Sequence, residues 1–252
     1  MNPAGSATKY DRIGTSYART RVADPRIEAR IHAALGDARM VCNVGAGTGS
    51  YEPTDRVVVA VEPSRTMIAQ RAEGAAPAVG ACAEQLPFAD DTFDAAMAVL
   101  TMHHWHDVAT GLAEMRRIAR RQVLFYFEPS FADDAWIVAD YFPEILELET
   151  ERNAPGRSDI EQHLDVVSIE AVPVPADCVD GFAGCFWSRP EAYLDPLVYE
   201  GMSSFAQLPA SQRDRGMQRL RAEIASGEWD RKYGHLRALG ECDLGYRVIV
   251  GR

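Results

Sequence analysis

Short apolar runs alternate along this chain with stripes of apolar residues at helical spacing. Short runs bounded by glycine, proline or charged residues are typical of buried strands. They cover residues 41–44, 57–61, 78–82, 93–100, 122–127, 166–174 and 244–250. Seven such runs with helical patterns between them predict an α/β protein built around one largely parallel sheet.

Start and stop signals support several of the helices. Asp24 and Pro25 are an N-cap and a first-turn proline for a helix that Gly36 ends. Ser64 is a second candidate N-cap, and Asp107 or His106 is a third. These signals predict helices over residues 25–35, from residue 65 onward and over residues 108–115. A fourth helix is expected over residues 217–224 and ends near Gly227.

A glycine-rich turn follows the first strand and is the clearest sign of chemistry. The sequence Met40-Val-Cys-Asn-Val-Gly-Ala-Gly-Thr-Gly49 breaks from apolar residues into alternating glycines. Gly45 and Gly47 let a ligand approach the backbone without a Cβ in the way. Glu62, at the end of the next apolar run, is placed like the acidic residue that binds a ribose diol in nucleotide-binding folds. A cofactor that contains a ribose is therefore expected.

Two classes of ribose cofactor fit this turn to different degrees. A dinucleotide fingerprint needs a third glycine, which would fall at Ser50. The chain instead has the pattern G-x-G-x-G, which weakens the case for a pyrophosphate. S-adenosylmethionine has no phosphate to bind, so the missing glycine does not count against it.

Four motifs in this order resemble the class I S-adenosylmethionine-dependent methyltransferases, specifically the ubiquinone/menaquinone-biosynthesis group with its methyltransferase type 11 domain. They are Val41-Cys-Asn-Val-Gly-Ala-Gly-Thr-Gly49, Glu62, Ala83-Glu-Gln-Leu-Pro-Phe88 and Phe93-Asp-Ala-Ala-Met-Ala-Val-Leu-Thr-Met-His-His-Trp105. The resemblance covers about residues 10 to 130 and is far more specific than a glycine turn alone. It implies a Rossmann-like, doubly wound sheet of seven strands, mostly parallel, with an antiparallel last strand.

The resemblance implies S-adenosylmethionine as the cofactor and names its site. The expected cofactor-binding residues are Tyr10, Tyr17, Arg21, Asn43, Gly45, Ala46, Gly47, Glu62, Pro63, Cys82, Ala83, Glu84, Val99 and Leu100. Tyr10 and Tyr17 lie seven residues apart, on one face of a possible helix. With Arg21 they either border the methionine end of the cofactor or simply pack. Residues 1–36 are therefore expected to form a helical lid.

Three positions depart from the family pattern. The crossover from Gly45 to Arg56 is barely long enough for a helix and contains Pro53, so the usual helix is expected to shrink to about one turn. Asn43 stands where the family more often has a carboxylate, which removes a charge beside the cofactor's ammonium. Cys82 stands where an acidic residue commonly contacts adenine, so the backbone of Ala83 or the side chain of Glu84 is expected to take that role.

A histidine-rich segment follows the strand over residues 93–100. His103, His104 and His106 lie at its carboxyl end, where open parallel sheets bind ligands. One interpretation is an ordinary helix start, and another is a metal site, which lacks carboxylate or cysteine support at ligand spacing. We expect no metal and take His104 as the candidate catalytic base.

Beyond residue 130 the resemblance fades and aromatic, helical segments follow. Residues 131–165 and 177–240 are expected to form a helical substrate cap, and Ser158-Asp-Ile-Glu161 matches a capping box. Residues 37–130 would be the cofactor-binding half and 241–252 the closing strand of one domain. The expected substrate-binding residues are His103, Trp105, Trp136, Tyr141 and Trp187. Extra core is the alternative interpretation of the aromatic residues.

Composition narrows the partners and the location. The chain has 252 residues, 47% of them hydrophobic, and a net charge of −11, which would repel a phosphate backbone. Neither a signal peptide nor a membrane span is recognisable, so a cytoplasmic protein that binds neither nucleic acid nor membrane is expected. Five cysteines without a C-x-x-C motif argue against a disulfide framework and a zinc site.

These features predict a methyltransferase that acts on a small molecule by in-line displacement. Two alternatives stay open. One is an enzyme of the same fold with other chemistry or with a protein or peptide as methyl acceptor. The other is a module that binds the cofactor without turning it over, an alternative that the departures at Asn43 and Cys82 support.

Overall fold

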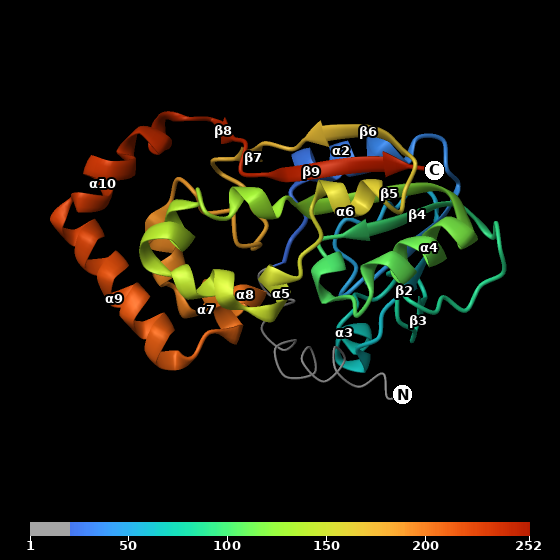
Figure 1. Ribbon diagram of the computed structural model, residues 1–252, viewed down its shortest axis with the longest axis horizontal. Helices are drawn as coiled ribbons and strands as arrows, with labels where there is room; N and C mark the ends of the chain where they lie inside the picture. Colours follow the sequence, from blue (N-terminus) through green and yellow to red (C-terminus); the bar gives the residue numbers. More distant parts are fainter. Residues whose placement is uncertain (1–20) are drawn as a thin grey trace.

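The computed structural model describes residues 21–252, which form a seven-stranded sheet with a helical lobe beyond one end of it (Figure 1). Tyr10 and Tyr17 lie outside the described residues. The strand order is β3-β2-β1-β4-β5-β9-β6. The strands are β1 (Met40–Val44), β2 (Val57–Val61), β3 (Ala78–Val79), β4 (Phe93–Val99), β5 (Ala119–Phe127), β6 (Val166–Ala171) and β9 (Tyr246–Gly251).

Strand pairing confirms the predicted fold class. β1 pairs in parallel with β2 and β4, β2 with β3, and β4 with β5. β9 lies between β5 and β6 and runs antiparallel to both. The expected strand over 78–82 is only the two residues of β3. The expected strand over 166–174 is divided into β6 and β7 (Val174–Pro175), and β7 pairs with β8 (Glu241–Cys242) in a separate small sheet.

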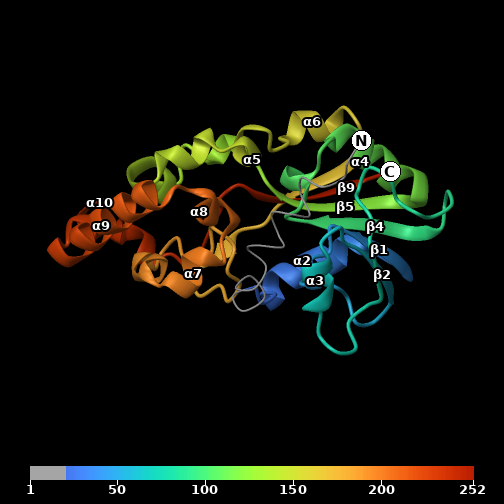
Figure 2. The ribbon, with the colours of Figure 1, turned by 90° about the horizontal axis from the view of Figure 1, so that it is seen from below.

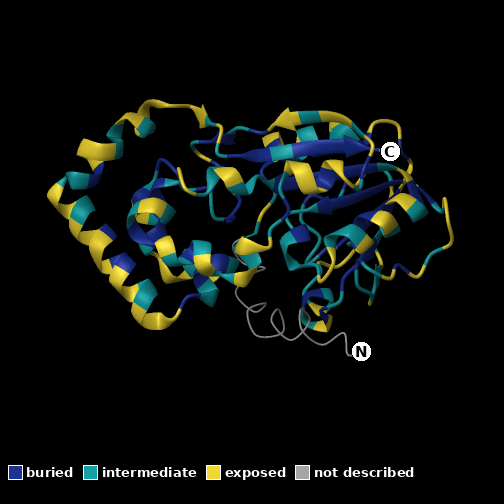
Figure 3. Ribbon diagram, in the orientation of Figure 1, coloured by how far each residue is buried: buried dark blue, intermediate teal, exposed yellow. Residues whose placement is uncertain are grey.

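Helices cover both faces of the sheet, as Figure 2 shows, with α2 (Pro25–Leu35) and α3 (Arg65–Ala69) below and α4 (Val108–Ile118) and α6 (Arg157–Glu161) above. Adjacent residues of a strand point to opposite faces. Val41 accordingly packs in the core with α2, and its neighbour Cys42 packs in the core with α4. In Figure 3 the strands β4 and β9 are mostly buried, whereas the helices around them carry exposed residues.

Side-chain caps fix where the helices α2, α3 and α4 begin. The Asp24 carboxylate accepts a hydrogen bond from the backbone N–H of Arg26 at the start of α2, and the Ser64 hydroxyl accepts one from Met67 at the start of α3. Asp107 caps α4 in the same way through Thr110. Each of these starts confirms a prediction.

Two local predictions are wrong. The loop over residues 45–56 contains turns but no helix, where one helical turn was expected. Pro53 and the left-handed backbone of Tyr51, with φ of 65°, both break helical geometry there. The capping box is shifted as well, because α6 begins after Gly156 and the Asp159 carboxylate accepts from the Gly156 N–H, instead of Ser158 pairing with Glu161.

The helical lobe is assembled from two separate stretches of chain. The first contributes η3 (Ile137–Tyr141), η4 (Pro143–Glu147) and α5 (Glu149–Arg152), after the short turn η2 (Pro129–Phe131). The second contributes η5 (Pro190–Leu194), α7 (Pro196–Glu200), α8 (Ser203–Gln207), α9 (Ala210–Ser226), α10 (Glu228–Tyr233) and η6 (Gly234–Ala238). Gly227 adopts a left-handed conformation and ends α9, as predicted.

The lobe has an aromatic core of its own. Trp136, Tyr141, Phe142, Tyr193, Phe205 and Trp229 are among its buried residues. Parts of the predicted cap lie elsewhere: Ile160 of α6 packs against the sheet, and the segment from Cys178 to Trp187 packs in the core on the α2 face. The lobe is therefore smaller than residues 131–165 and 177–240 together. In residues 21–252, none of the helices has the length and apolar character that crossing a membrane requires.

Candidate cofactor and acceptor sites

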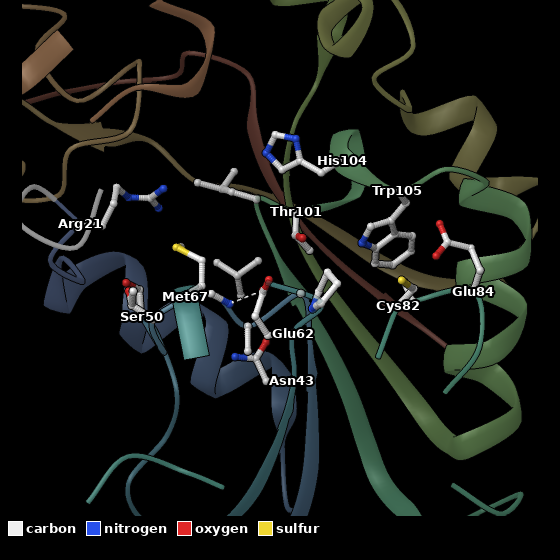
Figure 4. Close-up of a pocket in the computed structure, with 18 of the residues that line it drawn as sticks. Arg21, Asn43, Ser50, Glu62, Met67, Cys82, Glu84, Thr101, His104 and Trp105 are labelled. Carbon is white, nitrogen blue, oxygen red and sulfur yellow. Dashed lines mark hydrogen bonds between the residues drawn. The ribbon is translucent and has the colours of Figure 1, made fainter. Parts of the chain in front are cut away.

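A cleft opens at the carboxyl ends of β1, β2 and β4 (Figure 4). The chain order reverses between β1 and β4, since β2 and β3 lie on one side of β1 and β5 lies beyond β4. Open α/β sheets bind ligands at such a point. All twelve predicted cofactor residues within the described chain line this cleft: Arg21, Asn43, Gly45, Ala46, Gly47, Glu62, Pro63, Cys82, Ala83, Glu84, Val99 and Leu100.

The glycine turn keeps the floor of the cleft open. Gly45 and Gly47 have φ values of 71° and 54°, in the left-handed region that side chains disfavour. A Cβ at Gly45 would also lie 2.1 Å from the Thr101 Oγ1 atom. The backbone N–H groups of Gly45 and Ala46 both donate to the Val61 carbonyl, which fixes the turn against β2.

Glu62 braces the same turn from the next strand. One of its carboxylate oxygens accepts from the Gly47 N–H at 2.8 Å and the other from the Ser64 N–H at 2.8 Å. The residue is only 6% exposed and lines the cleft. Because a carboxylate has about four acceptor positions, Glu62 can brace the turn and also accept from a ligand.

Behind the turn, Asn43 belongs to a buried polar chain. Its Nδ2 donates to Glu52 Oε1 at 3.0 Å, and Glu52 Oε2 accepts from Arg71 Nη2 at 2.5 Å. Arg71 also donates to the Gly47 carbonyl. Asn43 is 1% exposed, yet its Oδ1 has no hydrogen-bond partner among residues 21–252. A buried acceptor without a donor is costly unless a ligand supplies one, and Asn43 lines the cleft.

The end of the cleft away from Arg21 is lined by a thiol, a carboxylate and an aromatic ring. Glu84, Cys82 and Trp105 lie together there in Figure 4, away from Arg21 and Ser50. The Glu84 Oε1 atom accepts from the backbone N–H groups of His106 and Asp107, which ties this end to the start of α4. Burial, then the nearby charges of Glu84 and Glu62, raise the pKa of the Cys82 thiol, so it is protonated at neutral pH.

A second cavity of about 440 Å³ adjoins the cleft and extends between the sheet and the helical lobe. Arg21, Leu100, Thr101 and His104 line both spaces, so they mark the junction. We call this space the acceptor cavity. Its lining is mostly apolar and aromatic and includes Tyr126, Phe131, Trp136, Phe182, Trp187 and Tyr193.

The predicted substrate residues divide among three places. His103, Trp136 and Trp187 line the acceptor cavity, and the Trp136 indole N–H donates to the Trp187 carbonyl at 2.8 Å. Trp105 lines the cofactor cleft instead, where it packs against Gly111. Tyr141 is not among the residues that line the cavity, and its hydroxyl donates to Glu223 within the helical lobe.

Several lining residues were missed by the sequence analysis. Thr101 is the most informative, since it contacts Gly45 and lines both spaces. Its position directly after β4 was a usable signal. Tyr126 lies near the end of β5, and its hydroxyl donates to Glu128 at 2.9 Å. Burial and this hydrogen bond raise the pKa of Tyr126, which keeps the phenol protonated beside the cavity.

Within residues 21–252, no group of three or more His, Cys, Asp or Glu side chains is placed to hold a metal ion. His103 and His104 have ring centroids 3.7 Å apart, and both are close to the junction of the two spaces. The four residues at the junction offer a guanidinium (Arg21), an apolar side chain (Leu100), a hydroxyl (Thr101) and an imidazole (His104).

The sheet order and the cleft at its switch point define a Rossmann-like α/β protein with a site for a nucleoside-containing cofactor. Residues 41–127 match the family described as a methyltransferase domain. The chain belongs to the class I S-adenosylmethionine-dependent methyltransferases, the family that the motifs predicted, and S-adenosylmethionine is its cofactor.

Three known proteins illustrate the relationship. A demethylmenaquinone methyltransferase of Mycolicibacterium paratuberculosis is 30% identical over 192 residues, which are 73% of this chain and 83% of that one. A crystal structure from Anabaena variabilis, provisionally assigned as a methyltransferase from an antibiotic biosynthesis pathway, is 33% identical, with a TM-score of 0.82 over 92% of this chain and 99% of that one.

The third is a geranyl diphosphate C-methyltransferase from Streptomyces coelicolor in complex with Mg²⁺, geranyl diphosphate and S-adenosyl-L-homocysteine. It is 13% identical and has a TM-score of 0.50 over 89% of this chain and 77% of that one. At this identity the likeness shows a shared fold.

The residues in the cleft fit the cofactor. The unpartnered Asn43 Oδ1 suits an ammonium donor, and Glu62 suits a ribose diol. The glycines at 45 and 47 leave the backbone accessible, which a Cβ would prevent at position 45. At the other end, the Trp105 ring and the Glu84 carboxylate suit a flat base with an amino group.

Proposed function

We propose that this methyltransferase transfers a methyl group to a small, largely apolar molecule bound in the acceptor cavity. One observation carries the proposal: an apolar cavity of about 440 Å³ shares its wall with the cofactor cleft at Leu100, Thr101 and His104. This size is within the range of ligand pockets in proteins, about 300–1,000 Å³. A cavity that meets the cofactor cleft along one edge brings an acceptor to the cofactor.

The proposed orientation of the cofactor follows the chemistry of the cleft. Its adenine lies beside Trp105, Ala83 and Glu84, and its ribose diol is bound by Glu62. Its methionine end lies near Asn43 and Arg21, with the ammonium on the Asn43 Oδ1 atom. The opposite orientation would put the carboxylate beside Glu84, whose charge would repel it.

The bound cofactor supplies an electrophilic methyl group, whose carbon bonds to the acceptor as its bond to sulfur breaks. The protein's contribution is to hold the acceptor in line and to exclude water. The apolar and aromatic residues that line the cavity disfavour water beside the acceptor, and Thr101 and Leu100 lie at the junction of the two spaces. Dry surroundings strengthen the electrostatic interactions of the reacting groups.

In this proposal His104 is the general base. Its position at the junction puts its imidazole beside both spaces, as Figure 4 shows for the cleft side. An acceptor hydroxyl or protonated amine loses its proton to His104 as the new bond to carbon forms. His103 lines only the acceptor cavity, where its ring packs on His104 and orients it.

A protein or peptide acceptor is less well supported, because the aromatic and apolar lining suits a molecule that is enclosed. The charged residues that line the cavity include the acids Asp134, Glu151 and Asp243 together with Arg21. These acids also disfavour an acceptor with a phosphate or carboxylate group. We therefore propose an acceptor without an anionic group. A cytoplasmic location is proposed separately, from the sequence.

The test is product formation with a graded panel of acceptors. Purified protein is incubated with S-adenosylmethionine and with neutral hydroxylated aromatics, their phosphorylated counterparts, or basic peptides, and S-adenosylhomocysteine is measured. Turnover with the neutral compounds and not with their phosphorylated counterparts is expected. Turnover only with peptides would refute the small-molecule proposal, and cofactor binding without any product would favour a binding module.

A further inference from the structure

Two residues that line the acceptor cavity have a hydroxyl group paired with a carboxylate. The Tyr126 hydroxyl donates to Glu128 Oε2 at 2.9 Å, and the Ser204 hydroxyl donates to Glu151 Oε1 at 2.7 Å. Tyr126 is 4% exposed and Ser204 is 9% exposed, and both line the cavity. They belong to β5 and α8, which are far apart in sequence, so the arrangement exists only in the folded protein.

The direction of these hydrogen bonds decides what the two hydroxyls offer to a ligand. A hydroxyl group has one hydrogen to donate and two lone pairs that accept. In each pair the hydrogen is directed at the carboxylate, so the oxygen offers only its lone pairs. Burial and the hydrogen bond to Glu128 raise the pKa of Tyr126, which keeps the hydrogen on the phenol oxygen. A ligand group against either hydroxyl must therefore supply the hydrogen itself.

Other polar hydrogens of the cavity wall are also directed at the protein. The Tyr193 hydroxyl donates to a backbone carbonyl at 2.6 Å, and the Tyr233 hydroxyl donates to a carboxylate at 2.8 Å. The indole N–H groups of Trp136 and Trp187 each donate to a backbone carbonyl. All four residues line the cavity. Their aromatic rings thus contribute apolar surface, while their polar hydrogens are used within the protein.

One short segment connects the two hydroxyl–carboxylate pairs. Glu151 is in α5, and beyond it the backbone N–H of Arg157 donates to Glu128 Oε2 at 2.9 Å. Residues 154 and 155, between these two contacts, line the cavity. The helix α5 packs next to η1 (Met102–His104), which carries the candidate base. The two hydroxyls therefore border one side of the cavity, which we call the polar wall.

We infer that the polar wall selects a methyl acceptor that carries a hydroxyl or N–H group in addition to the atom that is methylated. The inference rests on the proposed function and narrows the class of molecule that the acceptor cavity takes. The additional group donates to Tyr126 or Ser204, which are then specificity-determining residues. A carbonyl or ether oxygen in its place would face a lone pair, and both oxygens would be left without a donor.

Binding of two matched probes tests this selection without requiring turnover. One probe is a naphthalenediol with a hydroxyl on each ring, and the other is its dimethyl ether, which only accepts hydrogen bonds. Affinities are measured by calorimetry with protein saturated with S-adenosylhomocysteine. Wild type is expected to bind the diol about ten-fold or more tightly than the ether. Tyr126→Phe and Ser204→Ala are each expected to weaken binding of the diol about three-fold or more and to leave the ether nearly unchanged.

Two further variants separate hydrogen bonding from damage to the cavity. Glu128→Ala releases the Tyr126 hydrogen, which can then donate to a methoxy oxygen, so the ether should bind about three-fold more tightly. A purely structural role of this pair predicts weaker binding of both probes. Tyr141→Phe is the matched control, because its hydroxyl also donates to a glutamate carboxylate but Tyr141 is not among the residues that line the cavity. It should leave both affinities unchanged.

The possible results distinguish this inference from the proposed function. Equal affinities of the two probes in wild type would overturn the inference alone, as would a preference that Tyr126→Phe and Ser204→Ala leave unchanged. If one of these variants does not yield folded protein, the other carries the test. Binding that persists in Ala135→Trp, whose indole would occupy the cavity, takes place elsewhere and would also overturn the inference. If neither probe binds to wild type, the cavity does not admit a neutral aromatic molecule, and the proposed function fails as well.

Discussion

The Glu62 carboxylate and the Gly47 backbone N–H are joined by a hydrogen bond of 2.8 Å across the floor of the cofactor cleft. The side chain thus has two tasks, since it braces the glycine turn and faces the cleft. Any change at Glu62 alters the shape of the turn together with the acceptor positions offered to a ribose.

Glu62→Ala is expected to weaken the binding of S-adenosylmethionine by about 10- to 100-fold, because two backbone N–H groups lose their acceptor and the ribose loses its own. Calorimetry measures this directly. Glu62→Gln keeps one side-chain oxygen and should fall between wild type and the alanine variant. Unchanged affinity in Glu62→Ala would remove Glu62 from the cofactor site.

Gly45→Ala is expected to reduce both stability and cofactor affinity. The new Cβ would have to share space with Thr101 and adopt a positive φ. Gly74→Ala is the matched control, because Gly74 has a φ of 83° but no atom of residues 21–252 lies within 4 Å of its Cβ position. The conformational cost, about 1–2 kcal/mol, should be common to both variants. Thermal unfolding should show a larger loss at Gly45, and equal losses would contradict the close contact with Thr101.

His104→Ala is expected to lower turnover by about 100-fold while leaving the affinity for S-adenosylmethionine nearly unchanged, as removal of a general base does. Single-turnover kinetics and calorimetry measure the two quantities separately. Added imidazole should restore part of the turnover. A parallel loss of cofactor binding would instead assign His104 to the cofactor site.

Ala135→Trp is expected to raise the KM for the acceptor by about ten-fold or more, because Ala135 lines the acceptor cavity and the indole would occupy it. The affinity for S-adenosylmethionine should not change. Ala139→Trp adds the same group one turn further along at an exposed position, and it should leave acceptor kinetics unchanged. If the two variants behave alike, the acceptor binds elsewhere.

The charge of the Asp24 carboxylate is expected to stabilise the folded protein at neutral pH and not in strong acid. Burial raises its pKa, but hydrogen bonds from the Arg26 side chain, the Arg26 N–H and the Val179 N–H outweigh it and lower the pKa from 3.8 to about 2. Because the folded-state pKa is lowered, this stabilisation is present above about pH 4 and is lost as the pH falls through about 2.

Asp24→Ala should therefore lower stability by about 1–2 kcal/mol at pH 7, with a difference that shrinks between pH 4 and pH 2. Urea unfolding across this range measures it. Asp37→Ala removes a carboxylate at an exposed position just after the same helix and provides the comparison. A difference for Asp24→Ala that stays constant with pH would show that its charge has no part in the effect.

The fold and the cofactor cleft were predictable because they depend on local sequence signals. The runs that became β1 and β2, the caps Asp24 and Ser64, and the stop at Gly227 are each set by neighbouring residues. The glycine turn and Glu62 are separated by a single strand. Parallel strand order then brings their carboxyl ends to one edge of the sheet.

The acceptor cavity was less predictable because its walls come from distant parts of the chain. Trp136 and Tyr141 look equivalent in sequence, yet only Trp136 faces the cavity, since η3 turns the Tyr141 hydroxyl toward Glu223. The pair of Arg21 with Asp180 spans 159 residues, and no local pattern marks it. The missing helix after β1 depends on Tyr51, which has a positive φ and whose hydroxyl donates to Asp180.

The position of β9 between β5 and β6 has a consequence for the chain during its synthesis. In the part of the chain that the structure describes, β6 pairs only with β9. About 75 residues, including most of the helical lobe, separate the two strands. At a translation rate of about 5–20 residues per second, this stretch takes roughly 4–15 s to emerge from the ribosome. During that interval β5 and β6 each expose an edge that pairs with β9 in the folded protein. Chaperone capture and aggregation compete with folding at that stage.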